Sequence, residues 1–107
     1  MTERIPLVPS AMLGPRFTAA VDLAIRLHRD DVRKGKTIPY IAHLLGVCEL
    51  VLQDGGSEDE AIAALLHDAL EDHPEGITTD EMQREFGAGV LAIVRAARTR
   101  WNTTAAA

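Results

Sequence analysis

The stretch AIAALLHDALED, residues 61–72, decides how this chain folds. Its first six residues are all apolar, which is typical of a helix that is buried on every side. Just before it, Ser57 and Glu60 have the spacing of a capping box, so the helix is expected to begin at Ser57. The same helix is expected to continue to Asp72.

Acidic side chains crowd the end of this predicted helix, at Asp68, Glu71 and Asp72. The C-terminal end of a helix carries the negative pole of its dipole, so each carboxylate there costs about 0.3–1 kcal/mol. Asp68 and Asp72 are also four residues apart, and like charges at this spacing repel each other. A helix with this much negative charge at its C-terminal end is expected to bind a cation.

The spacing of these residues indicates the kind of cation. His67 and Glu71 lie one turn apart, as do Asp68 and Asp72, while His67 and Asp68 are about 100° apart around the axis. The adjacent pair can therefore bind one ion, with Glu71 and Asp72 near its water. Mixed imidazole and carboxylate ligands suit Mn²⁺, Fe²⁺ or Zn²⁺ better than Ca²⁺. The simpler alternative is a structural histidine beside a solvated helix end, and the four residues together favour the metal site.

Composition limits the class of protein. The chain of 107 residues is long enough for one domain, and its hydrophobic fraction of 47% with only 4% aromatic residues favours a helical core of Leu, Ile, Val and Ala. A net charge of −5 argues against a nucleic-acid binder. Cys48 is the single cysteine, which excludes an intramolecular disulfide and fits a reducing cytoplasm. Neither a membrane-spanning run nor a signal peptide is recognisable, so we expect a soluble, cytoplasmic protein that does not bind membranes.

Hydrophobic periodicity and capping signals predict an all-α fold of about five helices. Besides the helix over 57–72, they are expected over about 16–31, 40–53, 78–86 and 88–98. Thr78 and Glu81 have the spacing of a second capping box, which opens the helix over 78–86. Residues 1–15 contain three prolines and are expected to form an extended lead-in. Residues 100–107 lack periodicity and are expected to be a disordered or truncated tail.

Three further positions have two interpretations each. His28 lies on the apolar face of the first predicted helix, where a histidine is more often a residue at the edge of the core than a ligand. Arg33 and Lys34 follow that helix, and their charges are explained either by the helix dipole or by a phosphorylated ligand. Spacing alone favours the explanation by the helix dipole.

His43 lies in the first turn of the helix predicted over 40–53. An isolated histidine at such a place is usually structural, and only the company of His67 and Asp68 makes it a candidate ligand. Cys48, on the same helix, is expected to be a small core residue and not a nucleophile.

Four motifs follow one another in the chain: RKG at 33–35, IPYIAH at 38–43, AALLHDALED at 63–72 and FG at 86–87 before a valine-rich helix. In this order they closely resemble the HD-domain hydrolases of the RelA/SpoT type, over about residues 16–99. Those enzymes remove the 3′-pyrophosphate from the alarmones ppGpp and pppGpp. The ordered set is far more specific than the His-Asp pair alone.

The resemblance implies an all-helical HD fold, with orthogonally packed helices, and one Mn²⁺ ion, with Fe²⁺ or Zn²⁺ as alternatives. By position, His43, His67 and Asp68 match the family's metal ligands. Glu71 and Asp72 match the acidic pair that acts on the attacking water and the substrate.

The resemblance also changes the interpretation of the basic segment, because Arg33 matches a residue that family members place near the nucleotide, and Lys34 adjoins it. Leu44 stands where the family usually has Pro, and His73 where it commonly has Thr. Neither change removes a ligand. The family closes its metal site with an aspartate on a later helix, for which residues up to 107 offer no counterpart, so the domain is expected to be incomplete.

The expected function is therefore metal-dependent hydrolysis of a nucleotide pyrophosphate, and most specifically of the 3′-pyrophosphate of guanosine tetra- or pentaphosphate. One alternative is an HD phosphohydrolase that acts on another nucleotide. The other is a catalytically inactive HD module that only binds. The expected partner is a small-molecule nucleotide. The sequence does not indicate whether the chain forms an oligomer.

Overall fold

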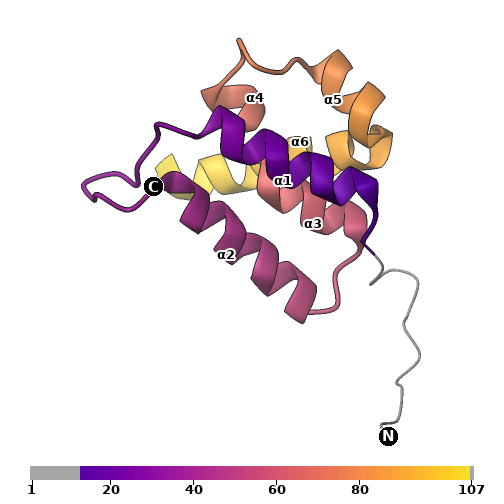
Figure 1. The fold of residues 1–107 in the computed structure, drawn as a ribbon, viewed down its shortest axis with the longest axis horizontal. Coiled ribbons are helices and arrows are strands. Elements are labelled where there is room, and N and C mark those ends of the chain that lie inside the picture. The colour runs from indigo at the N-terminus through magenta and orange to yellow at the C-terminus, as the bar shows by residue number, and fades with distance from the viewer. Residues whose placement is uncertain (1–12, 107) are drawn as a thin grey trace, which may run out of the picture.

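The computed structural model describes residues 13–106, with side chains described up to residue 97. This part of the chain forms six helices and contains no strand, which confirms the all-α prediction (Figure 1). The helices are α1 (Pro15–Leu27), α2 (Tyr40–Gln53), α3 (Glu58–Leu66), α4 (Ala69–Asp72), α5 (Thr79–Phe86) and α6 (Ala88–Ala106). The lead-in predicted for residues 1–15 lies outside the described residues up to residue 12, and Pro15 already begins α1.

The helix α3 occupies the centre of the fold. All six residues from Ala61 to Leu66 are buried, as the apolar run predicted. The helix packs against α1, α2 and α6, while α5 packs against α6 (Figure 1). The residues that follow Leu66 are therefore attached to a helix that packs against three others.

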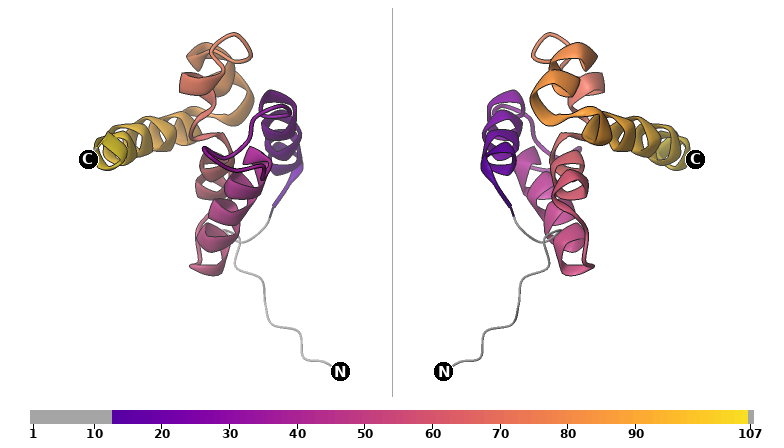
Figure 2. Two further views of the ribbon diagram at one scale, coloured as in Figure 1. Left: turned by 90° about the vertical axis from the view of Figure 1, so that its left-hand side faces the viewer. Right: turned by 90° about the vertical axis from the view of Figure 1, so that its right-hand side faces the viewer.

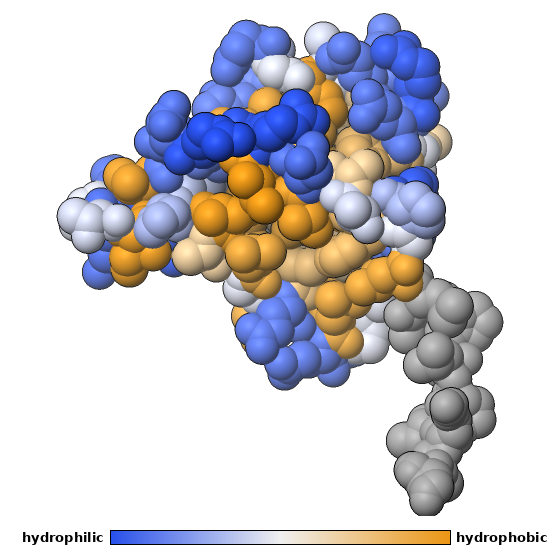
Figure 3. All heavy atoms as spheres, in the orientation of Figure 1, coloured by the Kyte–Doolittle hydropathy of each residue, from blue (hydrophilic) through white to orange (hydrophobic). Residues whose placement is uncertain are grey.

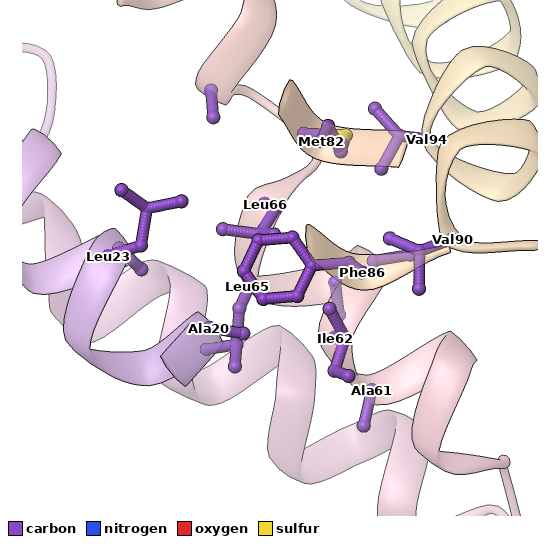
Figure 4. Packing of buried hydrophobic residues seen from close by; sticks show 14 of the residues in the cluster. Ala20, Leu23, Ala61, Ile62, Leu65, Leu66, Met82, Phe86, Val90 and Val94 are labelled. Atoms are coloured by element: carbon purple, nitrogen blue, oxygen red, sulfur yellow. The ribbon is translucent and has the colours of Figure 1, made fainter. Parts of the chain in front are cut away.

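The core is built mostly from Leu, Ile, Val and Ala, as the composition predicted. Among the fully buried hydrophobic residues that the structure describes, Phe86 is the one aromatic, and its ring lies beside Leu65 and Leu66 of α3 (Figure 4). Cys48 is buried in this core, and burial raises the pKa of its thiol, so the prediction of a core residue is confirmed. Leu44, at the position after His43, is fully buried.

Both predicted capping boxes are present. The Ser57 hydroxyl accepts a hydrogen bond from the Glu60 amide at 3.1 Å, and the Glu60 carboxylate accepts from the Ser57 amide at 2.8 Å. Thr78 and Glu81 repeat this arrangement at the start of α5. These bonds satisfy amides that a helix N-terminus leaves without an intrahelical partner, and they fix where α3 and α5 begin.

The prediction of one continuous helix from Ser57 to Asp72 is wrong. The helix α3 ends at Leu66, and after a turn at His67 and Asp68 the chain resumes as the single turn α4. At Asp68 the backbone has φ −98° and ψ −4°, which departs from helical values. Asp68 still directly follows the C-cap of α3, whereas Glu71 and Asp72 belong to the separate turn α4 and not to the end of α3.

Two other helix ends differ from the prediction. The helix α1 ends at Leu27 and not at Asp31, because His28 takes the C-cap and its ring contacts the Asp31 carboxylate at 2.8 Å, which closes the following turn. The helix α6 continues to Ala106 and not only to Arg98, and its end projects away from the other helices (Figure 2). No Gly or Pro follows Gly89, so nothing in the sequence stops this helix. The Trp101 side chain lies outside the described side chains.

The surface carries some exposed apolar residues. Figure 3 shows apolar residues gathered below the charged ridge of α1, on the face that α1 and α2 present. Ile25 and Leu45 are among the apolar residues whose exposed fraction is more than two-fifths. Among the helices that the structure describes, none has the length and apolar character needed to cross a membrane.

Candidate metal site and acidic pair

The turn after α3 presents His67 and Asp68. The His67 side chain is buried, and its Nδ1 lies 2.7 Å from the carbonyl oxygen of Ala64. Because a carbonyl oxygen only accepts hydrogen bonds, Nδ1 carries a hydrogen. In the neutral ring the lone pair is therefore on Nε2, which lies 3.1 Å from Oδ2 of Asp68. The fold thus selects the tautomer in which Nε2 can bind a metal.

His43 reaches the same place from the first turn of α2. Its ring lies edge-on to that of His67, with 5.8 Å between ring centroids. His43, His67 and Asp68 each offer one ligand atom, and these three atoms lie within 4.8 Å of one another. Ligands on one ion with bonds of about 2.1 Å lie up to about 4 Å apart, so small side-chain rotations bring all three onto one ion. The structure therefore brings the three predicted ligands together.

The protonation states of these groups suit a cation. Burial lowers the pKa of His43, and the positive charge of Arg33 lowers it further, so His43 is a neutral imidazole. Burial would raise the pKa of Asp68, but its hydrogen bonds with His67 and Tyr40 outweigh this effect and keep it ionised. Neutral imidazole and ionised carboxylate are the forms that bind metals.

His67 holds a proton more firmly than its burial alone would predict. Burial lowers its pKa, but the contacts with Asp68 and with the Ala64 carbonyl raise it more, so the pKa lies above the ordinary value. A bound cation takes the place of that proton, which is the usual exchange in such sites. The donor set of two imidazoles and one carboxylate fits a divalent ion of the Mn²⁺, Fe²⁺ or Zn²⁺ type.

Tyr40 is a member of this cluster that the sequence analysis missed. Its hydroxyl donates a hydrogen bond to Oδ2 of Asp68, and its ring lies 5.3 Å from that of His43. Burial and the neighbouring Asp68 both raise the pKa of Tyr40, so the phenol stays protonated and remains a donor. The signal was present in the sequence, because Tyr40 precedes His43 by three residues and so shares its face of α2.

The two candidate catalytic acids lie on α4. Glu71 and Asp72 are both exposed, and the Asp72 amide donates to the carbonyl oxygen of Asp68 at 2.8 Å. Partial burial raises the pKa of Asp72, and the nearby charge of Asp68 raises it further. The two acids therefore stand at the solvent side of the cluster, one turn beyond Asp68, although α4 is not a continuation of α3.

The two basic candidates lie on the loop between α1 and α2. This loop is closed by a bridge between Val32 and Pro39, in which the Arg33 amide donates to the carbonyl oxygen of Ile38 at 2.9 Å. Arg33 and Lys34 are exposed, and the charge of Arg33 acts on both His43 and Tyr40. Arg33 is thus close enough to the cluster to influence an anion bound there.

Comparison with known proteins gives a consistent result. Residues 20–107 match the family described as the HD domain. A human guanosine-3′,5′-bis(diphosphate) 3′-pyrophosphohydrolase is 41% identical over 78 residues, which are 70% of this chain and 42% of the relative. An enzyme of the same description from Haemophilus influenzae is 41% identical over 56 residues, which are 52% of this chain and 8% of that enzyme.

The similarity extends to proteins named for a different reaction. A GTP pyrophosphokinase from Streptomyces coelicolor is 36% identical over 75 residues, which are 70% of this chain and 8% of that protein. The chain spans less than half the length of the human relative. The range that matches the HD domain, residues 20–107, includes the cluster described above.

Proposed function

This chain belongs to the HD domain family, and we propose that it carries out metal-dependent hydrolysis of the 3′-pyrophosphate of guanosine tetra- or pentaphosphate. The observation that carries the proposal is the convergence of ligand atoms from His43, His67 and Asp68, with two carboxylates one turn away. The names of the human and Haemophilus influenzae relatives support the choice of substrate.

The family implies a divalent metal ion, and the ion we propose is Mn²⁺. His43 and His67 would each supply a nitrogen and Asp68 an oxygen. Bound there, the ion would lower the pKa of a coordinated water from about 15.7 toward neutrality and shield phosphate charge. Tyr40 holds the Asp68 carboxylate in place through its hydroxyl.

We assign the chemistry of the water to the acidic pair. Glu71 would accept a proton from the attacking water as general base and return it to the leaving group as general acid. Asp72, whose pKa burial and Asp68 raise, would hydrogen-bond the water or the leaving group and orient it. The exposed position of both side chains leaves room for a nucleotide phosphate beside them.

We assign substrate binding to the loop between α1 and α2. Arg33 would pair with a phosphate of the nucleotide, with Lys34 beside it as a second cation. These two residues offset the repulsion between a polyphosphate and a chain whose net charge is −5. Because a single cysteine cannot form an internal disulfide, the chain fits the reducing cytoplasm, where we propose that it acts.

The experiment is a ppGpp hydrolysis assay with the 107-residue chain, in which release of GDP and pyrophosphate is followed with and without added Mn²⁺. We expect turnover that depends on Mn²⁺ and that His67→Ala abolishes together with Mn²⁺ binding. If the chain binds Mn²⁺ but hydrolyses neither ppGpp nor pppGpp, the catalytic proposal fails, and a module that only binds takes its place.

A further inference from the structure

A second group of ligating side chains lies where the ends of α1 and α4 meet, and it shares no residue with the first. His28 takes the C-cap of α1, Asp31 lies in the turn that follows, and His73 takes the C-cap of α4. Oδ2 of Asp31 is 2.8 Å from Nδ1 of His28 and 2.6 Å from Nε2 of His73. One ligand atom from each residue lies within 4.8 Å of the others.

Without a metal, this arrangement must hold two hydrogens against one carboxylate oxygen. Oδ2 of Asp31 only accepts, so Nδ1 of His28 and Nε2 of His73 both carry hydrogens that point at it. The other ring nitrogen of His73 lies 3.1 Å from the carboxylate of Glu75. Both nitrogens of His73 therefore face carboxylate oxygens, Nε2 that of Asp31 and Nδ1 that of Glu75.

The same three residues offer a ligand set that a divalent cation would bind. The cation would replace the hydrogen on Nε2 of His73, and the hydrogen on Nδ1 of His28 would move to Nε2 of the same ring, so that both facing nitrogens would bind the ion through their lone pairs. Its two positive charges would balance the two carboxylates, Asp31 directly and Glu75 through His73. A carboxylate that accepts from the second nitrogen of a ligating histidine is the usual outer partner in metal sites.

We propose that His28, Asp31 and His73 form a second metal site, which takes a divalent transition-metal ion of the Zn²⁺ class. Two imidazoles and one carboxylate are a common zinc ligand set that leaves a position for water. Between Zn²⁺ and Mn²⁺, nitrogen ligands favour Zn²⁺. The exposed fraction of His28 is 2%, so one ligand is fixed in the core and does not need to be ordered when the ion binds.

The site lies beside the first cluster but is separate from it. The Tyr40 ring contacts both groups, with its centroid 5.1 Å from that of the His28 ring and 5.3 Å from that of the His43 ring. His73 stands where the resembled enzymes commonly have Thr, so a ligand is present here that the resemblance did not lead us to expect. The proposal is independent of the proposed hydrolysis, because it uses none of the residues assigned to that reaction.

The test is a Zn²⁺ titration of the metal-free 107-residue chain against a chromophoric chelator, at mildly alkaline pH where imidazole is neutral. We compare Asp31→Asn with Asp30→Asn, which changes the exposed neighbouring carboxylate. The Asp30→Asn variant is expected to bind as many Zn²⁺ ions as the unchanged chain, and Asp31→Asn one fewer. His73→Thr, which restores the residue common in the resembled enzymes, should lose the same ion.

A second measurement locates the ion. In imidazole nitrogen NMR of the chain saturated with Zn²⁺, the signals of Nδ1 of His28 and Nε2 of His73 should shift and their hydrogens should be lost. His67→Ala should leave these shifts in place, which separates this site from the first cluster. If Asp31→Asn and His73→Thr bind as many ions as Asp30→Asn, or if the His28 and His73 signals do not move, the proposal is overturned and the three residues form only a hydrogen-bonded cluster.

Discussion

The hydroxyl of Tyr40 donates a hydrogen bond to Oδ2 of Asp68, the same oxygen that faces Nε2 of His67 at 3.1 Å. Tyr40 and Asp68 are 28 residues apart and come from α2 and from the turn after α3. The bond therefore fixes the two elements that supply the candidate ligands relative to each other. It also keeps the Asp68 carboxylate turned toward His43 and His67.

From this contact we predict that Tyr40→Phe weakens Mn²⁺ binding by about 10–100-fold, the usual effect of removing an outer partner of a metal ligand. The phenylalanine ring keeps the packing against His43, so the metal-free protein should lose little stability. The measurement is the rise in Tm across a Mn²⁺ titration, since an ion that binds only the folded chain stabilises it by mass action. An unchanged Mn²⁺ dependence would show that Tyr40 does not orient Asp68.

Glu71 offers a way to separate chemistry from binding. If it serves the water and not the metal, Glu71→Gln should leave Mn²⁺ affinity nearly unchanged and lower ppGpp turnover by about 10²–10⁴-fold. Glu85→Gln, which changes an exposed glutamate on α5, is the matched control and should alter neither quantity. A loss of Mn²⁺ affinity in Glu71→Gln as large as that in His67→Ala would make Glu71 a ligand instead.

Arg33 should act on substrate binding. We expect Arg33→Ala to raise KM for ppGpp with a much smaller effect on kcat, because a residue that holds a phosphate in the ground state and the transition state alike contributes uniform binding. Lys34→Ala, on the same exposed loop, tests whether substrate binding needs the cation at position 33 or only positive charge on the loop. Equal effects of the two substitutions would indicate a diffuse attraction to the loop and not a specific contact of Arg33.

Local signals in the sequence located most of the fold. The bounds of α2 were predicted correctly, and the capping boxes at Ser57 and Thr78 marked the starts of α3 and α5. Such signals depend on neighbours three or four residues away, so they can be read without knowing the tertiary structure.

What could not be predicted depends on contacts between distant segments. The sequence gives no sign that α3 stops at Leu66, because Ala69 and Leu70 continue its apolar pattern. The break becomes favourable only where His67 faces His43 and Asp68 accepts from Tyr40, across 24 or more residues. The contact of Asp31 with His73 spans 42 residues and is equally invisible in the spacing.

The candidate site residues also divide into those that local sequence signals reveal and those that depend on contacts between distant segments. The adjacent pair His67 and Asp68 was recognisable from local charge alone, whereas His43 became a candidate only through their company. His28 is buried, as predicted for a histidine at the edge of the core, but its contacts with Asp31 and with the ring of His73 were not foreseen. The contact with Asp31 lies within the turn after α1, whereas the contact with His73 depends on the end of α4 lying against the end of α1.

The start of α3 is fixed by a cluster of charges far from either candidate site. Glu58 accepts a hydrogen bond from the Gly14 amide at 2.7 Å and pairs with Arg16 at 2.8 Å, and Arg16 also pairs with Asp59 at 2.6 Å. The Gly14 amide is the main cause of a lowered pKa at Glu58, and Arg16 lowers it further. The segment before α1 is thereby tied to the first turn of α3.

The lowered pKa makes stability depend on pH in a definite direction. A carboxyl whose pKa is lower in the folded state stabilises that state fully above its unfolded pKa of about 4.3, and this contribution is lost as the pH falls through the folded value. Because Glu58 is partly exposed, we expect Glu58→Gln to cost about 1 kcal/mol at neutral pH, or about 4–8 °C in Tm. The difference from the unchanged chain should shrink below a pH of about 4.3, and Glu85→Gln should show no such trend. A difference that is constant across this range would mean that Glu58 acts through packing and not through its charge.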